Sequence, residues 1–569
     1  MPMLKNFFFI ALLLVTGYLS EGCQKNHFLD ATDVTNLDEQ TVFSDSARTM
    51  DFLTGIYSDI GFSFNPQRYG PAGLEAACDE ADGPGYGTSS AYTQWAIGSI
   101  NAANVPNDAW NTCYTNIRRV NVFFKNIGRT PMEGAQKTRI KAEARFLRAW
   151  YYFILVKHYA GVPIVKDSIF SQFTPITSVR NTFSDCVDYI VSVCDSAAQD
   201  LPLTSFTNDY GRITKGMCMA LKAKILLYAA SPLFNGGQVA GDEPLRSLTG
   251  YPQADPARWK KAADAAKDVI DLGLYKLHTA SNSTVPGYGF YEVFTLRKNE
   301  EYILSQMKAP SNDLESLWMP ASRGAGSGAK PYQELVDAFP MKNGLPITDR
   351  ASGYDPSHPY DGRDPRFDFT IIHNESMIWK EQGPKQPVYT YVSYPLDGVY
   401  VGTSTGYFIN KMLQDNVVPN SFTASNRVYP LIRYAEILLD YAEALNEYEG
   451  PVAEVYDAVE RIRKRAGLDP YTLPEGLSRD DMRERIHNER RIELAFESQR
   501  FWDIRRWKTA ATEDNKVMQG MEITRLSTGA YKYKVFDVRR HVFRDNMYLW
   551  PIPQSEIGKS PQLIQNTGW

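Results

Sequence analysis

Carboxylates gather in two glycine-rich stretches of this 569-residue chain, and paired carboxylates are the groups that hydrolyse glycosidic bonds. In chain order they are Asp79, Glu80, Asp82, Asp361, Asp364 and Asp368. A glycosidase needs two of them roughly 5–10 Å apart across the sugar, and neither stretch carries a motif for that arrangement. The spacing also matches no calcium-binding loop. We therefore predict no catalytic residue, no metal site and no cofactor.

The histidines and most of the cysteines offer no metal site either. Seven histidines are scattered along the chain without an HExxH motif, which argues against zinc. Five cysteines show no CxxC pair: Cys78, Cys113, Cys186, Cys194 and Cys218. Because their number is odd, a full disulfide framework is not expected, and buried free thiols are favoured. A Cys186–Cys194 bridge is the alternative outside the cytosol.

Cys23 has a different chemistry, because a secretion signal precedes it. Lys5 supplies a positive charge, residues 7–15 are apolar, and Gly22 is a small residue at the cleavage site. The apolar run is too short to cross a bilayer, which takes roughly 20 residues. We predict cleavage before Cys23 and lipidation of its thiol, although Ser20 stands where lipoprotein signals normally have leucine. An ordinary secretion signal is the alternative.

Aromatic residues in irregular segments are the candidate ligand-binding residues. Tryptophan and tyrosine rings can stack on the apolar faces of sugars, while amides orient hydroxyl groups. The candidates are Trp95, Trp318, Tyr288, Tyr291, Asn101, Tyr86, Tyr92 and Tyr332. Trp95 and Trp318 come first, because a large ring in a glycine- and serine-rich loop has less core to join. Packing within the protein is the alternative for each.

The composition indicates a globular protein with a large core. The chain is 43% hydrophobic and 22% charged, with 34 tyrosines. A net charge of −5 argues against nucleic-acid binding, which needs basic patches that neutralise phosphates. No second apolar run is long enough to span a membrane.

Apolar residues spaced three and four apart predict a series of amphipathic helices. The expected helices cover residues 137–159, 214–230, 256–272, 431–447, 452–466 and 479–507. They combine alanines with large aromatics, as the stacked helix pairs of tetratricopeptide repeats do. Long irregular loops are expected at 71–106 and 282–405, with a short strand at 389–392. The predicted fold is mainly α, a tetratricopeptide-like α-α superhelix with long irregular loops and a minor β-ribbon.

Five blocks, in order over nearly the whole chain, resemble the SusD/RagB family. They are KAEARFLRAWYYF at 141–153 with GVP at 161–163, AKILLYAASPLF at 223–234, RYAEILLDYAEALN at 433–446, ERRIELAFESQRFWDIRRW at 489–507, and LWPIP at 549–553 with QNTGW at 565–569. The stretch 361–366 is similar to a structural turn of the family. The charged residues of the helical blocks are expected to form ion pairs rather than a ligand site. They include Arg145, Arg148, Glu489, Arg490, Arg491 and Glu493.

The resemblance implies a lipid-anchored protein on the surface of the outer membrane. Such proteins capture an oligosaccharide, or a peptide in some members, and deliver it to a SusC-like TonB-dependent transporter; they are not enzymes. Residues 1–22 would be the lipoprotein signal peptide, 23–235 the SusD-like N-terminal region, and 236–569 a C-terminal region integrated with it. Two other classes remain open: a surface glycan-degrading enzyme and a purely structural adaptor.

Overall fold

The computed structural model describes residues 38–569 apart from 66–67, 69–70, 85–89, 106–107, 171–178, 206–208, 238, 281, 381–382 and 422. The α-helices are α2 (Glu39–Phe43), α3 (Ser46–Tyr57), α4 (Ala91–Ala96), α5 (Ala109–Asn126), α6 (Gly134–Tyr159), α7 (Phe183–Gln199), α8 (Lys215–Ala230), α9 (Leu245–Thr249), α10 (Ala257–Asp271), α11 (Tyr288–Thr295), α12 (Asp313–Trp318), α13 (Gln333–Ala338), α14 (Arg366–Thr370), α15 (Tyr434–Glu449), α16 (Ala453–Ala466), α17 (Arg479–Glu493), α18 (Arg500–Arg506), α19 (Ala510–Glu513) and α20 (Gln554–Lys559). In this part of the chain no helix is both long enough and apolar enough to cross a membrane.

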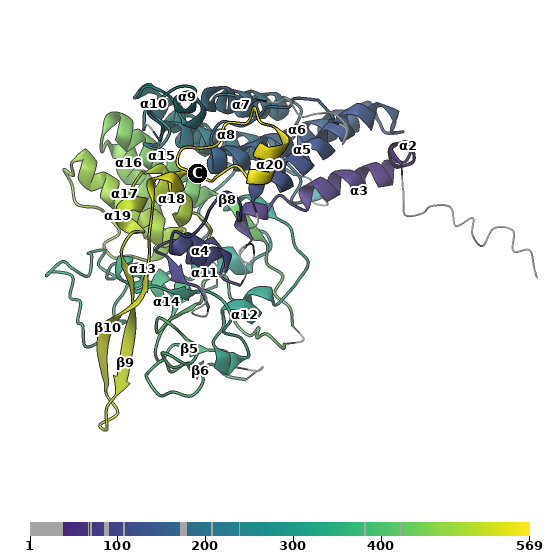
Figure 1. The fold of residues 1–569 in the computed structure, drawn as a ribbon. Helices are drawn as coiled ribbons and strands as arrows, with labels where there is room; N and C mark the ends of the chain where they lie inside the picture. The colour runs from purple at the N-terminus through teal and green to yellow at the C-terminus, as the bar shows by residue number, and fades with distance from the viewer. Residues whose placement is uncertain are drawn as a thin grey trace, which may run out of the picture.

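The long helices stack one after another in the upper part of the molecule (Figure 1). α5 packs on α6, α6 on α7, α7 on α8, and α8 on α10. Small side chains allow the helices to approach closely, since Ala142, Ala144 and Ala149 of α6 are fully buried. This helical array, α5 to α10 and then α15 to α17, confirms the predicted tetratricopeptide-like superhelix.

The chain leaves the helical array after α10 and returns to it at α15, which packs directly on α10. Residues 272–433 form most of the irregular region in the lower part of Figure 1. An antiparallel pair of strands holds the two sides of this excursion together, with Tyr302 of β2 opposite Arg433 of β8. Because β8 runs directly into α15, the irregular region is anchored rigidly to the array.

The described strands form short two-stranded antiparallel sheets. They pair β1 (Ala81–Asp82) with β3 (Lys330–Pro331), β2 (Tyr302–Gln306) with β8 (Tyr429–Arg433), β4 (Ile371–Ile372) with β7 (Phe408–Ile409), β5 (Met377–Ile378) with β6 (Gln386–Pro387), and β9 (Val517–Arg525) with β10 (Tyr531–Arg540). The β9–β10 hairpin projects from the lower edge of the molecule and is the β-ribbon (Figure 1). The strand expected at 389–392 is not formed; that segment follows β6 as an irregular loop.

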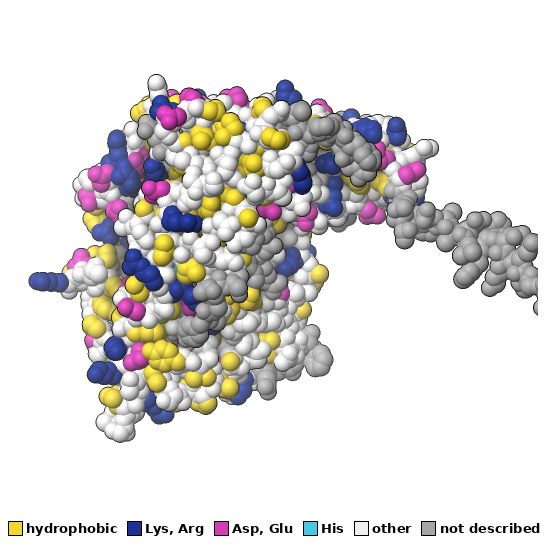
Figure 2. Space-filling view, in the orientation of Figure 1, with side chains coloured by type: hydrophobic (Ala, Val, Ile, Leu, Met, Phe, Trp, Pro, Cys, Tyr) yellow, Lys and Arg dark blue, Asp and Glu magenta, His cyan; other side chains and the backbone are white. Residues whose placement is uncertain are grey.

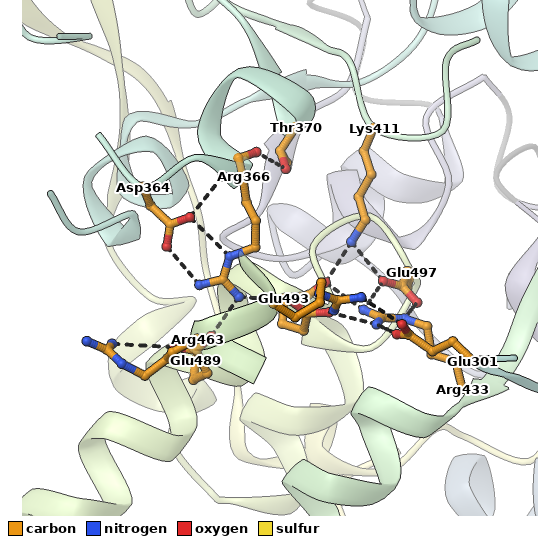
Figure 3. Close-up of polar contacts among 11 residues, drawn as sticks. Glu301, Asp364, Arg366, Thr370, Lys411, Arg433, Arg463, Glu489, Glu493 and Glu497 are labelled. Atoms are coloured by element: carbon orange, nitrogen blue, oxygen red, sulfur yellow. Dashed lines mark hydrogen bonds and ion pairs between the residues drawn. The ribbon is translucent and has the colours of Figure 1, made fainter. Parts of the chain in front are cut away.

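A buried group of charged residues joins the irregular region to the helical array (Figure 3). This ion-pair network consists of Glu301, Asp364, Arg366, Lys411, Arg433, Arg463, Arg465, Glu489, Glu493 and Glu497. Arg366 lies 2.6 Å from Glu489 and 2.8 Å from Glu493, and both carboxylates belong to α17. Burial by itself would raise the pKa of Glu493, but the arginines around it outweigh burial and lower the pKa. The family-type turn at 361–366 thus has a structural role.

Other charged side chains of the helical blocks also form ion pairs, as the sequence predicted. Arg145 pairs with Asp200 at 3.1 Å and Arg148 with Asp167 at 2.6 Å. Arg490 lies 2.6 Å from Asp440, and Arg491 lies 2.8 Å from Asp79. The five cysteines that follow Cys23 in the chain are buried and form no disulfide bonds. This confirms the prediction of free thiols.

The helix expected over 479–507 is interrupted between α17 and α18, and buried carboxyl groups stabilise the interruption. Phe496 and Ser498 have positive φ angles of 59° and 54°. The Phe496 amide donates to Glu80 at 2.8 Å, and the Ser498 hydroxyl donates to Glu75 at 2.9 Å. Burial, and then the neighbouring Glu75, raises the pKa of Glu80 to about 8. The segment before β1 therefore determines where the helix ends.

Replacing Glu80 by glutamine should change how stability depends on pH. Because the pKa of Glu80 rises from 4.5 to about 8 on folding, the folded protein keeps a proton that the unfolded chain releases between these values. Its stabilising contribution is complete below about pH 4.5 and is lost as the pH rises towards about 8, by up to ~1.4 kcal/mol per pH unit. Urea unfolding of parent and Glu80→Gln at several pH values measures the difference.

The expected result is that Glu80→Gln gains stability relative to the parent as the pH rises. Exposed Glu449→Gln is the control and should run parallel to the parent. Parallel curves for Glu80→Gln and the parent would show that Glu80 is ionised in the folded protein at neutral pH.

Candidate glycan-binding surface

Four of the predicted ligand-binding aromatics lie inside the protein. They are Trp95, Trp318, Tyr332 and Tyr92. Trp95 is fully buried, with its ring centroid 4.5 Å from that of Trp550 and 5.7 Å from that of Phe501. Trp318 is 2% exposed and packs near Phe496. A ring without an exposed face cannot stack on a sugar, so these four residues do not form an open ligand platform in this structure.

The buried tyrosines have structural hydrogen bonds. The Tyr332 hydroxyl lies 3.1 Å both from Asp82 and from His541, and it links the segment before α13 to the hairpin region. The Tyr92 hydroxyl donates to the Pro84 carbonyl at 2.7 Å. α4, which carries both Tyr92 and Trp95, packs on the core because Trp550 near the C-terminus supplies apolar surface to Trp95 that the local sequence does not reveal.

Three predicted residues keep exposed surface. Tyr288 and Tyr291 are half-buried, with ring centroids 5.2 Å apart, and both contact Phe369. Asn101 is exposed and accepts a hydrogen bond from the Ala103 amide within its own turn. Tyr86 and Cys23 lie outside the described residues.

Three of the six candidate carboxylates pair with arginines. Asp79 lies 2.8 Å from Arg500, Asp82 2.6 Å from Arg539, and Asp364 2.7 Å from Arg366. These three carboxylates and Glu80 are buried, whereas Asp361 and Asp368 are exposed. Within the described residues, no three His, Cys, Asp or Glu side chains come together as a metal site would require. The buried candidate carboxylates are therefore engaged by arginines and a backbone donor and are not open to a sugar.

A different set of aromatics forms a partly exposed surface. The tyrosine cluster consists of Tyr389, Tyr391 and Tyr394 from the loop after β6, and Tyr531 and Tyr533 from β10. Figure 2 shows yellow side chains between the β9–β10 hairpin and the position of β5 and β6 in Figure 1, and the loop after β6 contacts the hairpin there. The cluster lies in the irregular region, away from the helical array.

Backbone hydrogen bonds hold the loop of the tyrosine cluster from both sides. The Val392 amide donates to the Ile523 carbonyl of β9 at 2.8 Å. The Thr390 amide donates to the Asn374 side chain at 3.0 Å. A tight turn, in which the Tyr394 amide donates to the Tyr391 carbonyl at 3.1 Å, turns the chain back on itself. The three loop tyrosines are therefore presented on a fixed backbone rather than a free loop.

The rings of the tyrosine cluster lie close enough to act as one surface. Tyr389, Tyr391 and Tyr394 have pairwise centroid distances of 5.4–5.8 Å. Tyr391 lies 6.1 Å from Tyr531 across the gap to the hairpin, at an interplanar angle of 32°. Aromatic faces of this kind provide flat apolar contact area, and the phenol hydroxyls provide hydrogen bonds at the rim.

Polar groups surround the tyrosine cluster. Arg525 at the end of β9 places its guanidinium 5.7 Å from the centroid of the Tyr391 ring. The Tyr531 hydroxyl donates to Glu375 at 3.2 Å. Burial, and then the nearby Asp397, raises the pKa of Tyr394, so its hydroxyl remains a hydrogen-bond donor at neutral pH. Partly exposed rings and oriented polar groups therefore lie together at this surface.

Comparisons with known proteins agree with this architecture. A profile of the SusD family matches residues 288–569, and a second profile, described as starch-binding associating with outer membrane, matches residues 27–227. The chain belongs to the SusD family. A SusD-like protein of Formosa agariphila is 24% identical over 471 residues, which cover 80% of this chain and 79% of that protein.

Solved SusD-like structures share the fold over almost the whole chain. A SusD-like protein of Bacteroides fragilis has a TM-score of 0.76 and 26% identity, covering 94% of this chain and 99% of that one. A SusD-like protein described as laminarin-binding has a TM-score of 0.60 and 21% identity, covering 93% and 100%. At that identity the second likeness shows a common fold.

Sequence reasoning did not predict the tyrosine cluster of this SusD-family chain, although one local signal was present. Tyr389, Tyr391 and Tyr394 fall within six residues, and Tyr531 and Tyr533 alternate along a strand. The alternation could be detected from sequence, but the pairing of two segments far apart in the chain could not.

Proposed function

We propose that this chain is a surface glycan-binding lipoprotein that captures an oligosaccharide at the tyrosine cluster and delivers it to a SusC-like TonB-dependent transporter. Membership of the SusD family supports this proposal, as does the laminarin-binding description of one protein with the same fold. The observation that carries the proposal is the cluster itself, in which partly exposed rings from two segments far apart in the chain lie side by side. Tyr288 and Tyr291 are a second candidate platform.

Replacing Tyr391 by alanine should weaken glycan binding about thirtyfold or more. Tyr391 contacts Tyr389, Tyr394 and Tyr531, so its loss removes the central ring of the surface. Aromatic hot spots typically cost at least ~2 kcal/mol when truncated, which corresponds to that change in affinity. Calorimetric titration with laminarin and starch oligosaccharides measures it.

The matched control for this variant is Tyr448→Ala, which removes a tyrosine that is 36% exposed on α15. Its affinity should equal that of the parent, and both variants should keep the parent's melting temperature. If Tyr391→Ala and Tyr531→Ala both bind a glycan of the panel as tightly as the parent does, the binding site lies elsewhere.

Anchoring at Cys23 and partnership with the transporter can be tested together. Affinity purification from native membranes in mild detergent should recover a large β-barrel transporter with the parent protein. Cys23→Ser should move the protein to the soluble fraction, because stable anchoring depends on the acyl chains. A Cys23→Ser variant that stays with washed membranes would contradict the lipid anchor, and repeated recovery without a barrel would contradict the partnership.

We favour binding over catalysis because the buried candidate carboxylates already form ion pairs with arginines or accept a hydrogen bond from the backbone. Incubation with polysaccharides distinguishes the two functions, since a binding protein retains the polysaccharide without releasing fragments. Release of oligosaccharides by the purified protein would establish an enzyme instead.

A further inference from the structure

Arg525 is the charged residue placed most directly on the tyrosine cluster. It ends β9, and its cross-strand partner in β10 is Tyr531. Alternate residues of a strand point to opposite faces, so Arg525 shares its face with Ile523, which is fully buried against the body of the protein. The guanidinium is exposed and lies 5.7 Å from the Tyr391 centroid. The hairpin therefore directs this cation towards the rings.

The Arg525 guanidinium contacts the Tyr391 side chain, and hydrogen bonding to Tyr391 raises the pKa of the guanidinium. Among the described residues, no carboxylate forms an ion pair with it. Arg539 of β10, by contrast, lies 2.6 Å from buried Asp82. Arg323, on the Tyr394 side, donates to the carbonyls of Gln386 and Pro387. The negative charge of Asp397 lies near the Arg323 guanidinium, although the two groups do not form an ion pair.

The carboxylates around the tyrosine cluster are each occupied by a donor. Glu375 accepts from the Tyr531 hydroxyl at 3.2 Å. Asp397 is buried and accepts from the Ser322 amide at 2.8 Å. Glu522, next along β9 from Ile523 and so on the opposite face from Arg525, accepts from the Tyr400 hydroxyl at 2.7 Å. The second oxygen of Asp397 has no donor but is buried, so the exposed charge at the rings that lacks an opposite charge is the Arg525 guanidinium.

We propose that the tyrosine cluster selects acidic glycans, with Arg525 binding a carboxylate or sulfate group of the sugar while the rings hold its apolar face. This inference rests on the proposed function and names the ligand class for the same site. A guanidinium presents a planar fork of donors that matches carboxylate and sulfate oxygens, and such charge-assisted bonds are stronger than neutral ones. The Tyr391 ring already restricts the conformations of the Arg525 side chain. The arginine therefore loses less conformational freedom when a ligand binds.

Two pairs of probes test the selectivity and distinguish the acidic groups. Oligogalacturonides are compared with their carboxyl-reduced neutral forms, and carrageenan oligosaccharides with their desulfated forms. In low salt the parent should bind at least one acidic probe about tenfold or more tightly than its neutral counterpart. Raising the salt from about 0.02 M to about 0.5 M should reduce this preference, because exposed charges are screened.

Variants connect the preference to Arg525. Arg525→Gln should abolish the preference by lowering the affinity for the acidic probe about tenfold more than the affinity for its neutral counterpart, and Arg525→Lys should restore part of it. Lys532→Gln is the matched control, since Lys532 neighbours Tyr531 but points to the opposite face of β10. It removes the same charge from the hairpin and should keep the preference. Equal melting temperatures confirm that all variants fold.

Each outcome decides between the two proposals. A parent that binds neutral and acidic probes equally overturns the acidic selectivity but leaves glycan binding intact. An acidic preference that survives Arg525→Gln overturns the role of this residue. A parent that binds no probe of either pair, nor the laminarin and starch oligosaccharides, overturns the proposed function as well. A preference for one acidic probe only supports the inference and identifies the recognised group.

Discussion

Replacing Arg433 by methionine should lower the free energy of unfolding by about 3–5 kcal/mol. Arg433 is 1% exposed and donates to Glu301 at 2.6 Å, to Glu493 at 2.7 Å and to Glu497 at 2.8 Å. Methionine fills much of the same volume but leaves buried carboxylates without their main cation. The cost arises because an unpaired buried charge loses its hydration and gains nothing in return. Urea unfolding followed by circular dichroism measures the loss.

An exposed ion pair provides the control for Arg433→Met. Lys260 and Asp264 of α10 lie 2.7 Å apart, and their side chains are 51% and 60% exposed. Lys260→Ala should leave the free energy of unfolding close to that of the parent, since water solvates both charges when the pair is broken. A loss below 1 kcal/mol for Arg433→Met would mean that the ion-pair network does not stabilise the junction between the irregular region and the helical array.

Replacing Trp95 by alanine should also cost about 3–5 kcal/mol of stability, while glycan affinity should not change. Trp95 is fully buried against Phe501 and Trp550, so alanine leaves a cavity between α4, α18 and the C-terminal segment. Trp95→Phe fills more of that space and should cost less. Melting temperatures measured together with glycan titrations distinguish a core residue from a binding platform.

The opposite pattern would reverse the assignment of Trp95. If Trp95→Ala keeps the parent's melting temperature and loses glycan binding, then the ring is a ligand contact in solution and the buried position describes another state of the loop. The tyrosine cluster would then not be the only aromatic contact with the ligand.

The helices of this protein were predictable because their signals are local. Apolar residues at positions three and four apart face one side of a helix, so residues 137–159 and 256–272 correspond closely to α6 (Gly134–Tyr159) and α10 (Ala257–Asp271). The expected helix over 479–507 breaks where Glu75 and Glu80 hold the backbone at Phe496 and Ser498. Those carboxyl groups lie about 420 residues earlier in the chain, and periodicity contains no information about them.

The positions of the exposed aromatic rings could not be predicted from the sequence. The sequence indicated a SusD-family chain with aromatic ligand contacts in its irregular loops, and it favoured Trp95 and Trp318 on local composition. Burial of a ring is decided by whatever packs on it, and Trp95 is covered by Trp550 from the far end of the chain. Tyr391 is placed beside Tyr531 because the Val392 amide bonds to β9.

The sequence by itself therefore determined the helical array, the ion pairing of its charged side chains and the family, since these follow from short-range spacing and ordered blocks. Only the tertiary structure decided which aromatic rings face solvent and where Arg525 directs its charge. The physical reason is that side-chain exposure and electrostatic partnership arise from contacts between segments far apart in the chain, and local sequence does not specify those contacts.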